Sequence, residues 1–208
     1  MLNTYWPRLV DERPEFQFHV VDGDEILARA RSVPVRWDGT LEDLPDGIDG
    51  AIARAFDEGG ANTLCAMVIM VPRGVQSRGA SRLALEAMTA IAREHGFDAL
   101  IAPVRPNWKE RYPLTPIERY VEWHREDGLL FDPWMRTHER LGAEVLKAEP
   151  RSLRITATVA EWEERVGMAF PETGEYVFPG GLATVAIDRE ADVGRYWEPN
   201  VWMRHSVS

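Results

Sequence analysis

The first quarter of the chain alternates apolar and polar residues in a way that predicts a β-hairpin and a short helix. Residues 15–22 alternate with a period of two, and after a turn at residues 22–24 the pattern resumes from Ile26 to Trp37. Asp49 is the expected N-terminal cap of a short helix, whose apolar positions follow it and extend to Phe56. This segment therefore predicts two antiparallel strands and one helix.

The middle of the chain predicts a strand–helix–strand unit. Residues 63–71 form a continuous apolar run of strand length, which is typical of a strand buried on both faces. A polar loop over residues 72–81 follows. Residues 82–95 then space their apolar side chains along one face of a helix, with Gly96 just after its end. A second apolar strand over residues 97–104 completes a unit of βαβ type.

The second half of the chain combines an irregular segment with short elements. Residues 105–131 are rich in proline, aromatic and charged residues and are interpreted as an insertion. Asp132-Pro133 has the signature of a helix start, and Gly142 ends that helix. A helix capped by Thr158 is expected at 159–166, and further strands are expected at 143–148, 153–158, 176–178, 183–187 and 197–206.

The charge balance and the apolar pattern argue against two classes of partner. The 208 residues include 24 Lys plus Arg against 34 Asp plus Glu, which gives a net charge of −10. Binding to the nucleic-acid backbone requires clustered positive charge, and no basic run exceeds two residues, so we expect no nucleic-acid partner. No stretch approaches the roughly 18 apolar residues of a membrane span, so we expect no membrane association.

The cysteine and histidine content limits the chemistry further. Cys65 is the single cysteine, so no intrachain disulfide can form, which fits a reducing compartment. The five histidines show no metal-ligand spacing, and we expect no metal. The N-terminal residues lack a signal-peptide profile, so we expect a cytoplasmic protein. The preference for Arg over Lys, with abundant Ala, indicates a GC-rich bacterial genome.

The loop between the two central strands is where the sequence predicts ligand chemistry. It leads from a buried strand through Gly74 and Gly79 into a helix, whose first-turn N–H groups lack intrahelical partners and carry the positive end of the helix dipole. These features favour a phosphate or pyrophosphate at residues 76–81. Neither the P-loop motif nor the dinucleotide-binding glycine pattern is present. A turn without a ligand is the alternative.

Two segments resemble motifs of a known family. The sequence Gln76-Ser77-Arg78-Gly79-Ala80-Ser81 resembles the Q/R-x-x-G-x-G/A motif of the GCN5-related N-acetyltransferase (GNAT) family, and residues 138–145 resemble its Y-x-K-x-G-F segment. The resemblance covers about residues 15–148. It implies an α/β (α+β) fold with a mixed, mostly antiparallel central sheet and flanking helices. Within a single domain over 1–208, we expect a helical insertion at 105–131 and a C-terminal extension at 149–208.

The resemblance also implies a co-substrate and the residues that bind it. In this family the loop binds the pyrophosphate of acetyl-CoA, and the strand before it pairs with the pantetheine arm. For acetyl-CoA or another acyl-CoA, the corresponding residues here are Val71, Arg73, Gln76, Ser77, Arg78, Gly79, Ala80 and Ser81.

The resemblance places His138 where the family has its tyrosine, a general acid toward the leaving thiolate, so His138 is the candidate catalytic residue. The chain departs from the pattern at Ala143, which replaces an aromatic residue. It also lacks the family's asparagine: Phe131 or Asp132 occupies that region, and the nearest asparagine, Asn107, lies much earlier. No carboxylate lies on the strand 63–71, so no general base is evident there.

The aromatic residues of the insertion allow two interpretations. They could line the acceptor side of the cleft, since binding sites favour apolar walls, or they could form a small core of the insertion. The residues concerned are Trp108, Tyr112, Tyr120 and Trp123.

Together these features predict an acyl-CoA-dependent acyltransferase, an N-acetyltransferase, that transfers an acyl group directly to a small-molecule acceptor. A homodimer is an expectation from the family. The alternatives are a non-catalytic CoA-binding or ligand-binding protein of the same fold, and an acyltransferase that resembles acyl-homoserine-lactone synthases.

Overall fold

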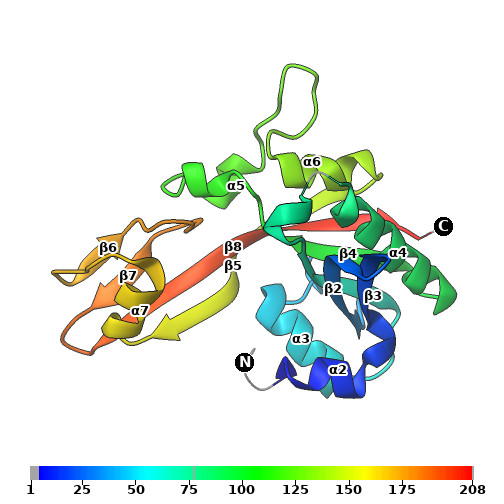
Figure 1. Ribbon diagram of the computed structural model, residues 1–208, viewed down its shortest axis with the longest axis horizontal. Helices are drawn as coiled ribbons and strands as arrows, with labels where there is room; N and C mark the ends of the chain where they lie inside the picture. Colours follow the sequence, from blue (N-terminus) through cyan, green and yellow to red (C-terminus); the bar gives the residue numbers. More distant parts are fainter. Residues whose placement is uncertain (1–4, 77, 208) are drawn as a thin grey trace.

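The computed structural model describes residues 5–76 and 78–207, so Ser77 of the predicted cofactor loop lies outside the described residues. Its centre is an eight-stranded sheet in the order β1-β2-β3-β4-β8-β7-β6, with β5 paired to β8 (Figure 1). The strands are β1 Gln17–Asp22, β2 Glu25–Val35, β3 Thr63–Met70, β4 Ala99–Val104, β5 Glu144–Ala157, β6 Gly174–Tyr176, β7 Val185–Asp188 and β8 Val193–Ser206. Among the described residues every pairing is antiparallel except that of β3 with β4. The predicted mixed, mostly antiparallel sheet is confirmed.

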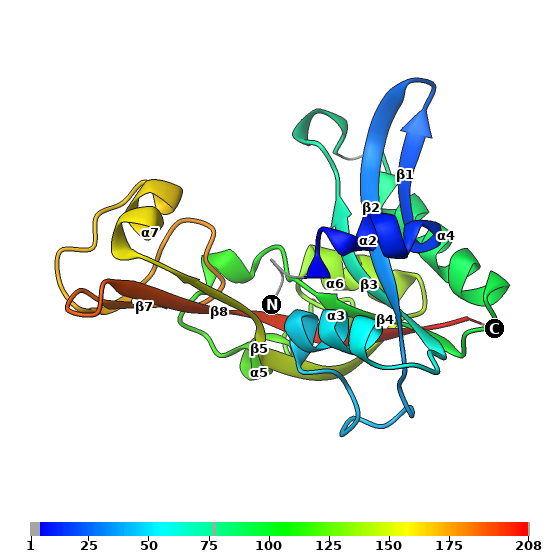
Figure 2. The same cartoon turned by 90° about the horizontal axis from the view of Figure 1, so that it is seen from below.

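Helices cover both faces of the sheet. They are α2 Arg8–Glu12, α3 Gly47–Asp57, α4 Ala80–Glu94, α5 Ile117–Tyr120, α6 Pro133–Arg140 and α7 Val159–Val166, with 3-10 turns η1 Pro14–Phe16, η2 Arg73–Val75 and η3 Lys109–Arg111. Strand β3 shows why the apolar run at its centre is continuous: Leu64 packs with α4, whereas Cys65 packs with α3 on the other face. The β1–β2 hairpin, at the top of Figure 2, projects away from the sheet and the helices that cover its two faces.

Part of the sheet continues into a second lobe. The distal lobe consists of α7, β6, β7 and the outer parts of β5 and β8, and it projects to the left in Figure 1. It has its own apolar cluster around Trp162, Phe170 and Tyr196. A Cβ on Gly194 of β8 would lie 2.3 Å from the Trp162 ring, so only glycine allows this close packing.

The structure corrects two expectations. Residues 201–206 of β8 pair with β4, so the last residues belong to the central sheet rather than to an extension outside a core that ends at 148. Helix α3 begins at Gly47, before Asp49, and the Asp49 carboxylate accepts the backbone N–H of Arg154 at 3.0 Å instead of capping the helix. The predicted caps at Asp132 and Thr158 are confirmed. No helix in the described ranges has the length and apolar character to cross a membrane.

Candidate functional site

Strands β3 and β4 separate after a short parallel pairing. Their register extends from Thr63 opposite Ala99 to Cys65 opposite Ile101, although the strands continue to Met70 and Val104. The β3 edge beyond Cys65 is therefore left without β4 as a neighbour. Unpaired backbone N–H and C=O groups at such an edge can bind an extended ligand as a strand would.

A cleft of about 640 Å³ lies beside this separation. One wall comes from the end of β3, the following loop and the start of α4, and the other comes from Asn107 and from Trp134 and Thr137 of α6. Gly79 occupies the N-cap of α4 with φ +74°, and no heavy atom lies within 4 Å of a Cβ built there. The positive end of the α4 dipole thus borders open space, an arrangement that favours an anionic group.

The structure brings together most of the described residues predicted to bind the cofactor. Val71, Gln76, Gly79, Ala80 and Ser81 line the cleft. Because Ala80 is buried and Gly79 has no side chain, a ligand can approach the backbone of the first helical turn closely.

The two arginines of the loop lie outside the residues that line the cleft. Arg78 forms ion pairs with Asp22 at 2.5 Å and Glu25 at 2.6 Å, both at the β1–β2 turn, so its charge is directed toward the hairpin. Arg73 lies in the η2 turn. For Arg78 the structure therefore differs from the expectation that its guanidinium group faces the pyrophosphate, and the cationic side chain in the lining is Arg82.

Three further lining residues come from outside the predicted loop. Trp134 and Thr137 are three positions apart on α6, so they share one face of that helix. Asn107 follows β4 and reaches the same wall. The sequence analysis did not predict Asn107 as a site residue, because the family's asparagine is expected near residues 131–132 and Asn107 lies much earlier in the chain.

Asp132 holds this wall in place. Its carboxylate is buried and accepts five hydrogen bonds: from the backbone N–H groups of Asn107 (3.2 Å), Trp108 (2.7 Å), Trp134 (2.9 Å) and Met135 (3.2 Å) and from the Tyr120 hydroxyl (2.9 Å). One side chain thus caps α6, anchors the segment after β4 and secures the insertion.

His138 does not lie in the cleft but beneath it. It is 2% exposed, and its Nδ1 lies 2.9 Å from Nε2 of His205. His205 also hydrogen-bonds the backbone of Leu141. If His205 donates to that carbonyl, its Nε2 is free to accept the Nδ1–H of His138.

This environment corrects the expected role of His138. Burial, together with His205, lowers the pKa of His138 to about 3, and burial lowers the pKa of His205 to about 4. Both imidazoles are therefore neutral at pH 7. A buried, neutral imidazole outside the cleft cannot act as the protonated general acid that the resemblance implied.

The aromatic residues of the insertion pack on one another. Tyr112 and Trp123 meet edge to face with centroids 4.9 Å apart, Tyr120 is 1% exposed, and Trp108 packs on Phe131 at 5.4 Å. None of the four predicted acceptor-binding residues lines the cleft. Their packing supports the alternative interpretation, a small core of the insertion.

Neither a reactive cysteine nor a metal site finds support in the described residues. Cys65 is buried, and burial raises the pKa of its thiol well above the usual range, so it is not a reactive thiolate. Among the described residues, no group of three His, Cys, Asp or Glu side chains is placed to hold a metal ion.

Comparison with known proteins identifies the family. No family model matches the chain. The chain is 30% identical to "Arginine N-acetyltransferase avaD" of Aspergillus versicolor, over 98% of this chain and 81% of that protein. Its fold is similar to the loading GNATL domain of CurA from Lyngbya majuscula (TM-score 0.64, 17% identity, 96% of this chain and 80% of that one). It is also similar to the GphF GNAT-like decarboxylase in complex with isobutyryl-CoA (TM-score 0.62, 16% identity, 97% and 83%).

The curated relative does not favour the two alternatives, a non-catalytic binding protein and an enzyme resembling acyl-homoserine-lactone synthases. The predicted activity, acyl transfer from an acyl-CoA, is supported by the curated relative. The chain is an acyl-CoA-dependent acyltransferase and belongs to the GCN5-related N-acetyltransferase family.

Proposed function

We propose that the protein transfers the acetyl group of acetyl-CoA to an amino or guanidino nitrogen of arginine or a closely related small molecule. The acceptor class is suggested by the curated relative, which is named for arginine N-acetylation. The observation that carries the proposal is the cleft between the separated strands and the start of α4, because it combines a free strand edge with an anion-binding helix terminus.

In this proposal each part of the cleft has one task. The first-turn N–H groups of α4, around Gly79 and Ala80, bind the pyrophosphate. The backbone of β3 up to Val71 holds the pantetheine arm. Asn107 and the Trp134 ring form the opposite wall and orient the thioester. Each of these contacts positions the reactants, the contribution that converts a bimolecular reaction into an effectively intramolecular one.

Acyl transfer then needs little acid catalysis from the chain. The neutral form of the acceptor nitrogen attacks the thioester carbonyl, the C–S bond breaks to release the CoA thiolate, and the nitrogen gives one proton to water. Because thiols have pKa values of roughly 8.5, the departing thiolate can take its proton from water near neutral pH. This proposal gives His138 no role in proton transfer.

Gly79→Glu tests the cofactor site. The substitution places a carboxylate at the helix terminus, and we expect the affinity for acetyl-CoA to fall at least about tenfold in calorimetry, a change of about 1.4 kcal/mol. Gly96→Glu is the matched control. Gly96 lies at the other end of the same helix, with φ +69° and no atom within 4 Å of a built Cβ, so the backbone strain is similar. Equal affinities of the two variants would show that the site is misplaced.

Turnover tests the acceptor class. Incubation with acetyl-CoA and arginine should release free CoA thiol and produce arginine that carries one acetyl group by mass spectrometry. Lysine, ornithine and agmatine serve as competing acceptors. A protein that binds acetyl-CoA but acetylates none of these molecules would contradict the proposal.

A further inference from the structure

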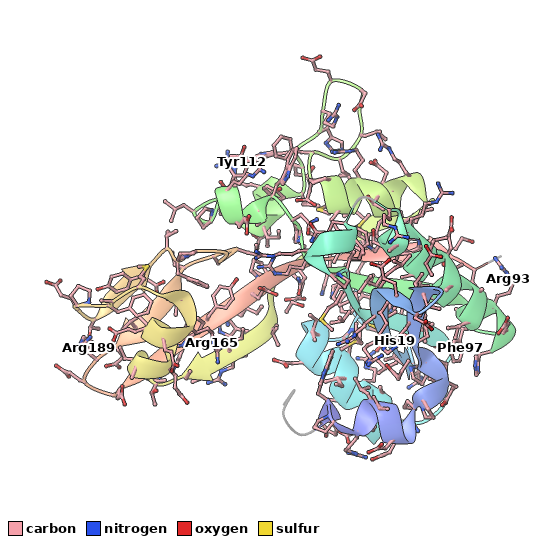
Figure 3. The ribbon with its side chains drawn as sticks, in the orientation of Figure 1. His19, Arg93, Phe97, Tyr112, Arg165 and Arg189 are labelled. Atoms are coloured by element: carbon pink, nitrogen blue, oxygen red, sulfur yellow. The ribbon has the colours of Figure 1, made fainter. Side chains whose placement is uncertain are left out.

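The guanidinium group of Arg78 connects the start of α4 to the β1–β2 hairpin. Its Nη2 lies 2.5 Å from a carboxylate oxygen of Asp22, and its Nη1 lies 2.6 Å from one of Glu25. Asp22 and Glu25 lie opposite each other at the end of the hairpin, whose first strand, β1, carries the His19 labelled in Figure 3. Two carboxylates of the hairpin therefore hold the cation that precedes the N-cap of α4.

The charges at this junction oppose the binding of an anion. Arg78 and its two carboxylate partners together carry a net charge of −1, and the exposed Asp24 lies in the same turn. The pyrophosphate and the 3′-phosphate of acyl-CoA carry several negative charges, and the helix terminus beside Gly79 favours such groups. An arginine that served only the cofactor would be left free to face it, so the two carboxylates call for a separate explanation.

Arg78 is placed so that it can exchange these partners. The side chains of Arg78, Asp22 and Glu25 are 41%, 66% and 53% exposed, so water reaches all three when the ion pairs open. Exposed ion pairs are weak because water screens them. The Cα atom of Arg78 lies one peptide unit, about 3.8 Å, from that of Gly79, a distance that the arginine side chain spans. The space beside Gly79 is open, since no heavy atom lies within 4 Å of a Cβ built there.

We propose that Arg78 is a phosphate ligand held in reserve, which exchanges Asp22 and Glu25 for phosphate oxygens when acyl-CoA binds. The inference rests on the cofactor site proposed above. A guanidinium group suits both sets of partners, because its planar N–H groups pair with carboxylate and phosphate oxygens alike. The hairpin turn thus competes with the cofactor for one cation and sets the affinity of the site.

This competition acts on the product as well as on the substrate. Acetyl-CoA and CoA carry the same phosphates, so the carboxylates weaken the binding of both. When the phosphates of CoA leave Arg78, Asp22 and Glu25 replace them, which lowers the barrier to release of the product. Product release limits turnover in many enzymes, so a turn that speeds it raises kcat.

Neutralising the two carboxylates tests the exchange. Asp22→Asn with Glu25→Gln should tighten the binding of acetyl-CoA and of CoA at least about fivefold in calorimetry, because Arg78 no longer has to be withdrawn from a carboxylate. Glu94→Gln with Asp127→Asn is the matched control. It removes the same charge at two exposed positions outside the cleft and should leave both affinities unchanged.

Arg78→Gln shows whether the gain in affinity passes through the arginine. In this background, neutralising Asp22 and Glu25 should tighten CoA binding by less than about twofold at 0.15 M salt, where exposed charges more than about 8 Å apart are largely screened. An equal gain with and without Arg78 would mean that the carboxylates only repel the phosphates, which would overturn the exchange.

The dissociation rate of CoA tests the effect on release. Stopped-flow displacement of CoA from the Asp22→Asn, Glu25→Gln variant should be at least about threefold slower than from the unaltered protein, since most affinity differences arise in the dissociation rate. The Glu94→Gln, Asp127→Asn control should release CoA at the unaltered rate. Equal rates for the variant and the unaltered protein would refute the effect on release.

Failure of the cofactor site and failure of the exchange give different results. If Gly79→Glu binds acetyl-CoA as tightly as Gly96→Glu, the cofactor site itself is misplaced. If Gly79→Glu weakens binding, but the loss of both hairpin carboxylates leaves affinity unchanged or lowers it, the cofactor site stands and the exchange is refuted. The ion pairs of Arg78 would then serve only to hold the loop in place.

Discussion

Replacing Asp132 with alanine should lower the free energy of unfolding by about 3–5 kcal/mol. Its buried carboxylate accepts five hydrogen bonds, and buried donors left without an acceptor cost about 1–3 kcal/mol each, partly relieved by local rearrangement. The cost would be concentrated in the wall that carries Asn107 and Trp134, so acetyl-CoA affinity should fall as well. Urea unfolding and calorimetry measure the two effects.

Two further variants show how much of the lost stability comes from the hydrogen bonds of Asp132. Tyr120→Phe removes one donor from the Asp132 carboxylate and should cost about 1 kcal/mol. Asp127→Ala, at an exposed position of the same insertion, should change stability by no more than about 0.5 kcal/mol. If Asp132→Ala were as stable as Asp127→Ala, the carboxylate would not be the anchor described above.

Stability should fall steeply as the pH is lowered from about 6.5 toward 4. The ordinary pKa of both His138 and His205 is 6.5, and in the folded protein the values are about 3 and about 4. Below pH 6.5 the unfolded chain therefore binds protons that the folded chain does not, so the unfolded state gains stability. Above pH 6.5 neither state binds them, and this contribution stays constant.

Urea unfolding at a series of pH values measures this linkage. Near pH 5 the slope of the free energy of unfolding against pH should approach the uptake of two protons on unfolding. Each proton is equivalent to about 1.4 kcal/mol per pH unit. His138→Phe keeps a flat ring and removes one of the titrating groups, so its slope should approach one proton. A slope that is the same in both proteins would show that the two imidazoles are not buried together.

Local signals account for what the sequence predicted correctly. The alternation at residues 17–22, the apolar run at 63–70 and the cap at Asp132 each depend on residues close together in the chain. The glycine-bearing loop was placed correctly at the start of α4 for the same reason, since strand, turn and helix are consecutive there.

The errors concern contacts between residues far apart in sequence. Arg78 forms ion pairs with Asp22 and Glu25, more than fifty positions earlier, and no local sequence pattern predicts these contacts. The burial of His138 depends on His205 at the far end of the chain. Asn200 lies opposite Glu149 of β5, a neighbour that only the sheet register reveals.

The position of β8 has a consequence for how the protein is made. This strand is the neighbour of β4 on the side away from β3, yet it follows β4 by half the chain. During synthesis the ribosome therefore releases every other strand before the one that closes the sheet. Until then, β4 exposes an unpaired apolar edge of the kind that associates with other chains. Such long-range pairing also slows folding, so newly made protein should depend on chaperones more than its size suggests.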